Sequence, residues 1–133
     1  MKVELTLHEV LMAANVGVMR QISSIKRNLK NKHGANGKDD WQLHIEGACG
    51  ELAVAKALGI YWDGSINTFK RGGDVGELQV RTRSSHEYDL IVRKNDKNDD
   101  RFVLVTGRCP DYIVRGWITA EHAKKREWLK KHG

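Results

Sequence analysis

The sequence predicts an α+β domain in which two N-terminal helices pack on a mixed, mostly antiparallel sheet of four or five strands, followed by a C-terminal helix. Two observations lead to this fold class. Up to about residue 58, apolar residues recur every three or four positions, which is the spacing of amphipathic helices. From residue 65 onward the pattern changes to short apolar segments separated by polar turns, which is typical of strands. Helices first and strands afterwards favour an α+β arrangement.

The composition indicates a single globular domain that covers residues 1–133. Hydrophobic residues make up 40% of the chain and charged residues 30%, as in ordinary globular proteins, and the length allows a real core. The 23 Lys and Arg residues exceed the 17 acidic residues and give a formal net charge of +6. This basic excess favours a polyanionic partner such as nucleic acid.

The sequence also predicts where the protein works. Cys49 and Cys109 are far apart and lack the CxxC spacing, so we expect neither a disulfide framework nor a structural zinc site. The first residues lack the apolar run of a signal peptide, and no segment has enough consecutive apolar residues to span a membrane. We therefore expect a cytoplasmic protein with no membrane partner.

Residues 6 to about 30 form the first expected helix. Thr6 and Glu9 have the spacing of a capping box, with Thr6 as the N-cap. Basic residues, including Arg20 and Lys26, are expected on the side opposite an apolar stripe. The stripe consists of Leu7, Leu11, Ala14, Val18, Ile22, Ile25 and Leu29.

The second expected helix runs from about Asp40 to Leu58. Asp39 or Asp40 can cap its beginning, and Gly59 can end it. The run Gly47-Ala48-Cys49-Gly50 is unusual inside a helix because each glycine costs roughly 1 kcal/mol relative to alanine. These small residues predict that another backbone packs closely against this turn.

The rest of the chain predicts strands and a last helix. The polar run Lys94 to Arg101 is expected to be a turn between two strands, and Trp117 is expected in the core. A helix capped by Thr119 should run to about residue 131. The expected strands are Ser65 to Phe69, Gly76 to Arg81, Leu90 to Arg93, Phe102 to Thr106 and Tyr112 to Ile118.

The segment from residue 72 to residue 82 carries the strongest functional signal. A glycine-rich turn holds Asp74 and leads into a strand in which Glu77, Gln79 and Arg81 alternate with apolar residues and therefore share one face. An acidic residue, an oxygen donor and a cation in this order are the layout of a metal-dependent phosphodiesterase site. The alternative is an amphipathic edge strand with a solvated polar face.

The order of these motifs resembles the PD-(D/E)xK nuclease superfamily, in particular its small phage-type members. A helix with Gly50-Glu51-Leu52-Ala53 is followed by a strand, then Gly-Gly-Asp at residues 72 to 74, then a strand with a polar-x-basic pair. The resemblance covers roughly residues 45 to 123. It implies a restriction-endonuclease-like core, hydrolysis of DNA phosphodiester bonds, and one or two Mg²⁺ or Mn²⁺ ions.

The resemblance also implies roles for four residues. Glu51 matches the helix glutamate that binds the metal or its water, and Asp74 matches the central metal-binding aspartate. Gln79 stands where a second acidic residue is usual, and Arg81 stands where a lysine is usual. The resemblance thus implies metal ligation by Glu51, Asp74 and Gln79 and a phosphate contact by Arg81.

Two of these positions depart from the family pattern. Gln79 offers an amide oxygen but no negative charge, and Glu77, on the same expected strand face, is the candidate for the missing carboxylate. Arg81 stays protonated in proteins, so it cannot act as a general base, although it can clamp a phosphate. The departures leave open three interpretations: a metal-dependent nuclease, a catalytically silent binding module on the same fold, and a phage-borne protein that inhibits a host factor.

Basic residues close to this segment suggest further contacts with DNA. Lys70, Arg71 and Arg83 could bind phosphates on either side of the scissile bond, or could form a solubilising surface. If the chain is phage-encoded, its expected location is the host cytoplasm. A domain of this size often needs a second copy to cut both strands of a duplex, so a homodimer is also possible.

Overall fold

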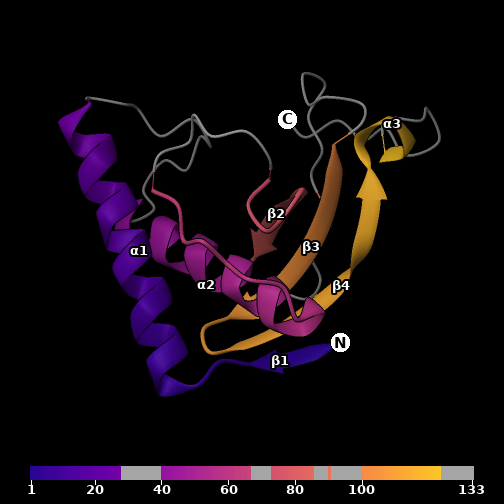
Figure 1. Cartoon of the computed structure of the whole chain (residues 1–133), viewed down its shortest axis with the longest axis horizontal. Helices are drawn as coiled ribbons and strands as arrows, with labels where there is room; N and C mark the ends of the chain where they lie inside the picture. The colour runs from indigo at the N-terminus through magenta and orange to yellow at the C-terminus, as the bar shows by residue number, and fades with distance from the viewer. Residues whose placement is uncertain (28–39, 67–72, 86–89, 91–99, 124–133) are drawn as a thin grey trace.

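The computed structural model of the chain describes residues 1–27, 40–66, 73–85, 90 and 100–123. These ranges confirm the α+β class (Figure 1). Their elements are, in chain order, β1 (Lys2–Glu4), α1 (Leu7–Lys26), α2 (Asp40–Leu58), β2 (Leu78–Arg83), β3 (Arg101–Arg108), β4 (Asp111–Thr119) and α3 (Ala120–Ala123).

The four described strands form one mixed sheet in the order β1-β4-β3-β2. The β1–β4 and β3–β4 pairs are antiparallel, whereas β2 and β3 are parallel. Helix α2 lies across the sheet and contacts all four strands, and α1 packs on α2 (Figure 1). The described part of the chain is therefore layered as helix, helix and sheet, with α2 in the middle.

The core lies between α2 and the sheet. Ala48, Cys49, Ala53 and Val54 of α2 are completely buried. The strands contribute buried residues to the same cluster, and burial of these apolar side chains is the main favourable contribution to folding. They are Val3, Val80, Val103, Val105 and Tyr112.

Helix α1 begins as the sequence predicted, but it packs through a different face. The capping box is present: the Glu9 amide donates to Thr6 Oγ1 at 3.3 Å, and the Thr6 amide donates to Glu9 Oε1 at 2.7 Å. The contact with α2 is made by small residues, since Ala13 and Gly17 are buried. A Cβ atom on Gly17 would lie 2.5 Å from the Ile45 Cα atom, so the two helix backbones nearly touch.

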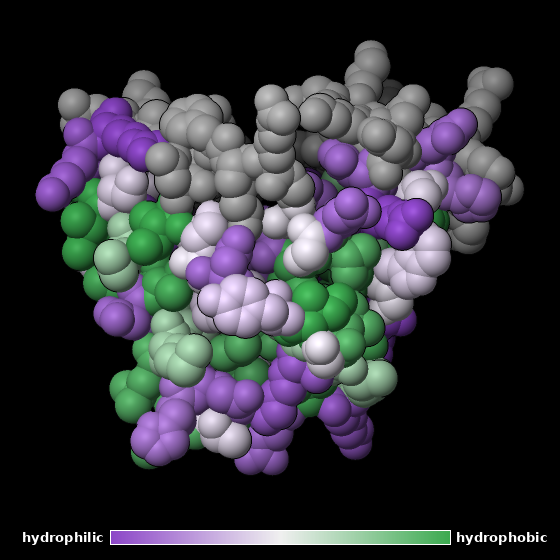
Figure 2. All heavy atoms as spheres, in the orientation of Figure 1, coloured by the Kyte–Doolittle hydropathy of each residue, from purple (hydrophilic) through white to green (hydrophobic). Residues whose placement is uncertain are grey.

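The expected apolar stripe of α1 is largely exposed, which corrects the prediction that it is the packed side of an amphipathic helix. Figure 2 shows apolar residues gathered over α1 at the left of the molecule. The close approach at Gly17 selects the small-residue face for packing, and it turns the larger aliphatic side chains outward. The exposed large apolar residues of α1 are Leu7, Leu11, Met12, Met19, Ile22 and Ile25.

Helix α2 has the predicted bounds, and Gly59 follows it with a φ angle of +65°, as expected for a glycine that ends a helix. The prediction of close packing at its glycines needs a correction. A Cβ atom on Gly50 would meet the side chain of Thr82 in β2, not another backbone, and Gly47 faces open space.

The sheet differs from the prediction in several strands. Three of the five expected strands correspond to β2, β3 and β4, whereas β1 was not predicted. Residues 65, 66 and 90 are not in strands, and the rest of those two expected strands lies outside the described residues. Of the expected turn at 94–101, only residues 100 and 101 are among the described residues, and Arg101 begins β3.

The C-terminal part bears on two further predictions. Thr119 caps α3, since its Oγ1 atom accepts from the His122 amide at 3.2 Å, but residues 124–133 lie outside the described part. Trp117 is 64% exposed, so its expected place in the core is wrong. No helix among the described residues is long and apolar enough to cross a membrane.

Candidate functional site

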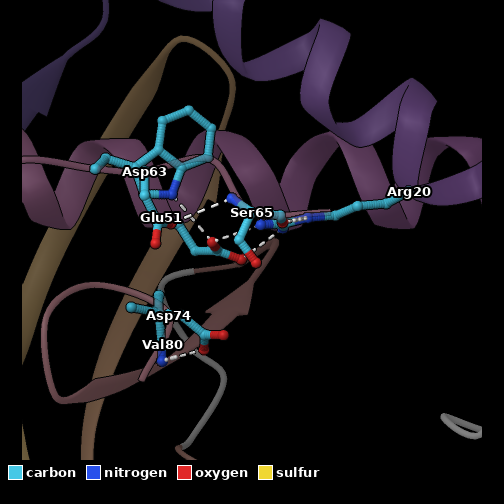
Figure 3. A network of polar contacts seen from close by, with 7 residues as sticks. Arg20, Glu51, Asp63, Ser65, Asp74 and Val80 are labelled. Atoms are coloured by element: carbon cyan, nitrogen blue, oxygen red, sulfur yellow. Dashed lines mark hydrogen bonds and ion pairs between the residues drawn. The ribbon is translucent and has the colours of Figure 1, made fainter. Parts of the chain in front are cut away.

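Glu51 of α2 is a buried carboxylate held by a charged partner and a hydrogen-bond donor. Its side chain is only 10% exposed and forms a two-pronged ion pair with Arg20 of α1, with Nη1–Oε2 at 2.7 Å and Nη2–Oε1 at 3.0 Å. Trp62 Nε1 also donates to Oε1 at 3.1 Å. Arg20 Nε donates to the Ser65 carbonyl at 2.9 Å, so this network joins α1, α2 and the segment after α2 (Figure 3).

Burial dominates the electrostatics of this carboxyl group. Loss of hydration raises the pKa of Glu51 above its ordinary value, although Arg20 and the Trp62 hydrogen bond act in the opposite direction. The negative charge of Asp74 also raises the pKa of Glu51. Two carboxylates from separate parts of the chain therefore lie close enough to influence each other.

Asp74 is positioned by the turn that precedes β2. The Gly73 amide donates to the Gly76 carbonyl at 2.9 Å, and Val75 and Leu78 form a bridge that reverses the chain. Asp74 Oδ2 accepts from the Val80 amide at 2.9 Å, which fixes the carboxylate beside the beginning of β2 (Figure 3). Oδ1 has no hydrogen-bond partner among the described residues.

The glycines of this turn are required by its geometry. A Cβ atom on Gly73 would lie 2.3 Å from the Leu78 carbonyl oxygen, and Gly76 has a φ angle of +56°. Side chains are poorly tolerated at both positions. The glycine-rich sequence therefore specifies the tight turn that presents Asp74.

Gln79 and Arg81 lie on one face of β2, as the alternation predicted. Val80 and Thr82 face α2, so Gln79 and Arg81 lie on the other face of the sheet. The guanidinium carbon of Arg81 lies 4.6 Å from the ring centroid of Phe102 in β3, within the range of a cation–π contact. Glu77 is exposed in the turn before β2 begins.

The structure brings some of the expected site residues together. Glu51 and Asp74 influence each other electrostatically, whereas Gln79 and Arg81 lie on the face of the sheet opposite α2, the helix that carries Glu51. Arg83 is half-buried at the end of β2, whereas Lys70 and Arg71 lie outside the described residues. Among the described residues, no group of three or more His, Cys, Asp or Glu side chains has a metal-binding arrangement.

The donor atoms of this region suit a hard divalent cation in type. Glu51 and Asp74 carry carboxylate oxygens, Gln79 carries an amide oxygen on the other face of the sheet, and Mg²⁺ commonly uses one or two carboxylates and several waters. The Arg20 ion pair occupies both Glu51 oxygens. Asp74, whose Oδ1 has no hydrogen-bond partner in the described part of the chain, is therefore the stronger candidate for direct contact with a metal.

Sequence analysis missed Arg20 and Trp62 as partners of Glu51. Arg20 was assigned to the polar side of its helix because its charge favours solvent. A signal did exist: Ala13, Gly17, Gln21 and Ser24 follow at spacings of three and four and mark a small-residue face that includes Arg20.

A second polar cluster anchors the β3–β4 turn on α2. Tyr112 donates its hydroxyl proton to Glu46 Oε2 at 2.6 Å, and the Cys109 amide donates to both Glu46 oxygens at 3.3 and 3.4 Å. Cys49 is completely buried beside Cys109, and burial raises the pKa of the Cys49 thiol to about 12. This cluster is structural, since its thiol stays protonated and its carboxylate is already bonded.

The chain has no match among protein-family models, curated proteins or solved structures. The resemblance to PD-(D/E)xK nucleases therefore depends on the motif residues and on how the fold arranges them.

Proposed function

We propose that this protein is a metal-dependent nuclease that hydrolyses DNA phosphodiester bonds on a restriction-endonuclease-like core. The observation that carries the proposal is the proximity of the Glu51 and Asp74 carboxylates, contributed by α2 and by the turn before β2. This is the motif order that the resemblance implies. The net charge of +6 supports a polyanionic substrate.

Each site residue has a defined part in this proposal. Asp74 would hold Mg²⁺ or Mn²⁺ through its open carboxylate oxygen, Gln79 would offer a neutral amide oxygen, and Glu51 would contribute through the metal's water. The bound ion would lower the pKa of water and stabilise charge on the phosphate. Arg81, which lies over Phe102, would contact a phosphate group through its guanidinium group.

A comparison of two carboxylate variants tests the proposal. Asp74→Asn removes the charge at the site with little change in volume, and Asp111→Asn is a matched control at the exposed first residue of β4. Cleavage of supercoiled, linear and single-stranded DNA is measured with Mg²⁺, Mn²⁺ or EDTA. We expect metal-dependent cleavage by the wild type and Asp111→Asn, and a loss of at least about 100-fold in Asp74→Asn. Equal cleavage by Asp74→Asn contradicts the proposal.

One observation favours a second function, a catalytically silent nucleic-acid-binding module on the same fold. Arg20 neutralises Glu51 with both of its terminal nitrogens, so the ion pair already does what a metal would do for this carboxylate. Calorimetry with Mg²⁺ separates the two functions. A silent module shows no binding near millimolar Mg²⁺ and still binds DNA, whereas the nuclease shows Mg²⁺ binding that Asp74→Asn weakens.

A further inference from the structure

Trp117 of β4 is an exposed aromatic residue in a position where a core residue was expected. Its side chain is 64% exposed, although it lies in a nine-residue strand in the interior of the sheet order. Exposure alone does not mark a binding surface, so the neighbours of the ring decide what it can do. β1 pairs only with residues 111–113 of β4, so the part of β4 with Trp117 has no neighbour on that side among the described strands.

The sheet register places Trp117 in line with the candidate site. Val80, whose amide binds Asp74, is paired with Val103 of β3, and Val103 is paired with Trp117. Paired residues share a face of the sheet, and neighbouring strands are about 4.8 Å apart. Trp117 is therefore on the α2 side of the sheet, about 10 Å across it from Val80. Val103 belongs to the core cluster and is 3% exposed, whereas its partner Trp117 is 64% exposed.

The Trp117 ring lies beside a positively charged side chain and next to an irregularity in the strand. The guanidinium carbon of Arg101, at the start of β3, lies 5.6 Å from the centroid of the Trp117 ring. The register shifts between Leu104 and Val105, opposite Arg115, and Gly116 has a φ angle of +142°. Such a bulge redirects the side chains next to it, and bulges are frequent beside binding sites.

We propose that Trp117 and Arg101 form a stacking platform for an unpaired base, and that the nuclease therefore acts on single-stranded DNA or on single-stranded segments of a duplex. The proposal rests on the function proposed above. Proteins that bind single strands combine cationic grooves with aromatic rings on which bases stack.

A paired duplex fits this platform poorly. Its bases are already stacked on one another, so an exposed ring on a strand gains little from contact with the outside of the helix. The phosphates of a duplex would still interact with Arg101 and with the net positive charge. The platform therefore predicts a preference that depends on the ring of Trp117 and not on charge alone.

Binding measured in EDTA tests the platform separately from cleavage. Fluorescence anisotropy is recorded with a labelled 12-nucleotide oligo-dT and with a labelled 12-base-pair duplex. The variants are Trp117→Ala, Trp117→Phe and, as a matched control, Tyr61→Ala, which removes an aromatic ring that is 84% exposed outside the helices and strands. Far-UV circular dichroism establishes that each variant is folded.

We expect Trp117→Ala to weaken oligo-dT binding by about 5- to 140-fold, the range that stacking of one base provides. Trp117→Phe should retain most of the affinity, Tyr61→Ala should match the wild type, and duplex binding should change less than threefold. Equal oligo-dT affinity of Trp117→Ala and the wild type overturns the platform, as does an equal loss in Tyr61→Ala. Failure of the nuclease proposal shows separately, as cleavage that Asp74→Asn does not reduce.

Discussion

Replacement of Arg20 by methionine isolates the energetic role of the ion pair at the candidate site. Met keeps most of the apolar volume of the Arg20 side chain but leaves the Glu51 carboxylate with Trp62 as its remaining donor. The two side chains of the pair are 17% and 10% exposed, so the charge that remains is mostly desolvated. Removal of one partner from a buried pair costs about 3–5 kcal/mol. This is a large part of the roughly 5–15 kcal/mol that stabilises a typical domain.

The loss should depend on pH in a defined direction. Burial already raises the pKa of Glu51 above its ordinary value of 4.5, and Arg20 is the main group that opposes this shift. Without Arg20 the folded-state pKa of Glu51 rises further, so the folded protein binds this proton more tightly than the unfolded chain. The stability from this proton is present below pH 4.5 and is lost as pH rises through the raised pKa. The destabilisation by Arg20→Met should therefore increase from pH 4.5 to pH 8.

Urea unfolding followed by tryptophan fluorescence measures these free energies between pH 4.5 and pH 8. Glu51→Gln in the Arg20→Met background should recover part of the loss at pH 8, because it removes the buried charge. Lys56→Met is a control for an exposed pair, since the Lys56–Glu9 distance is 2.8 Å but such pairs contribute only about 0–1 kcal/mol. The reasoning is refuted if Arg20→Met costs no more than Lys56→Met, or if its cost is the same at every pH.

Three further substitutions test the packing and capping of α1. Gly17→Ala should destabilise the protein by about 1–3 kcal/mol in urea unfolding, because the new Cβ atom meets the Ile45 backbone; a stabilised variant would contradict this contact. Thr6→Ala should cost about 1 kcal/mol through loss of the cap. Lys56 and Thr6 lower the pKa of Glu9, so stability from Glu9 is present above pH 4.5 and is lost as pH falls through the folded-state pKa. A Glu9→Gln variant whose stability relative to the wild type does not change in acid would contradict that assignment.

The parts of the fold that the sequence predicted well depend on neighbouring residues. The capping box of Thr6 and Glu9, the bounds of α2 and the helix end at Gly59 are local hydrogen-bonding and backbone preferences. The turn at Asp74 is of the same kind, because Gly73 and Gly76 are the residues that its geometry needs. Such features can be predicted without knowing what packs against them.

The parts that sequence analysis predicted wrongly depend on distant packing. Helix α1 has an aliphatic stripe and a small-residue face, and periodicity alone cannot tell which of them meets α2. Close approach at Gly17 selects the small-residue face. In the same way, Val103 and Trp117 are paired and share a face of the sheet, but only Val103 lies under α2. Whether a strand residue is covered by α2 depends on the position of the helix over the sheet, and the strand pattern does not encode that position.

The Arg20–Glu51 pair also connects stability to the choice between nuclease and silent module. The Arg20 guanidinium group compensates the negative charge of Glu51, and a cation bound at Asp74 would do the same, so the two would compete for this carboxylate. In a nuclease, Arg20→Met should therefore tighten Mg²⁺ binding while it destabilises the metal-free protein, and Mg²⁺ should restore part of the lost stability. In a silent module the same variant loses stability, and Mg²⁺ restores none of it. Urea unfolding of Arg20→Met with 10 mM Mg²⁺, about tenfold above the millimolar range where such a site would bind, thus distinguishes the two functions without a cleavage assay.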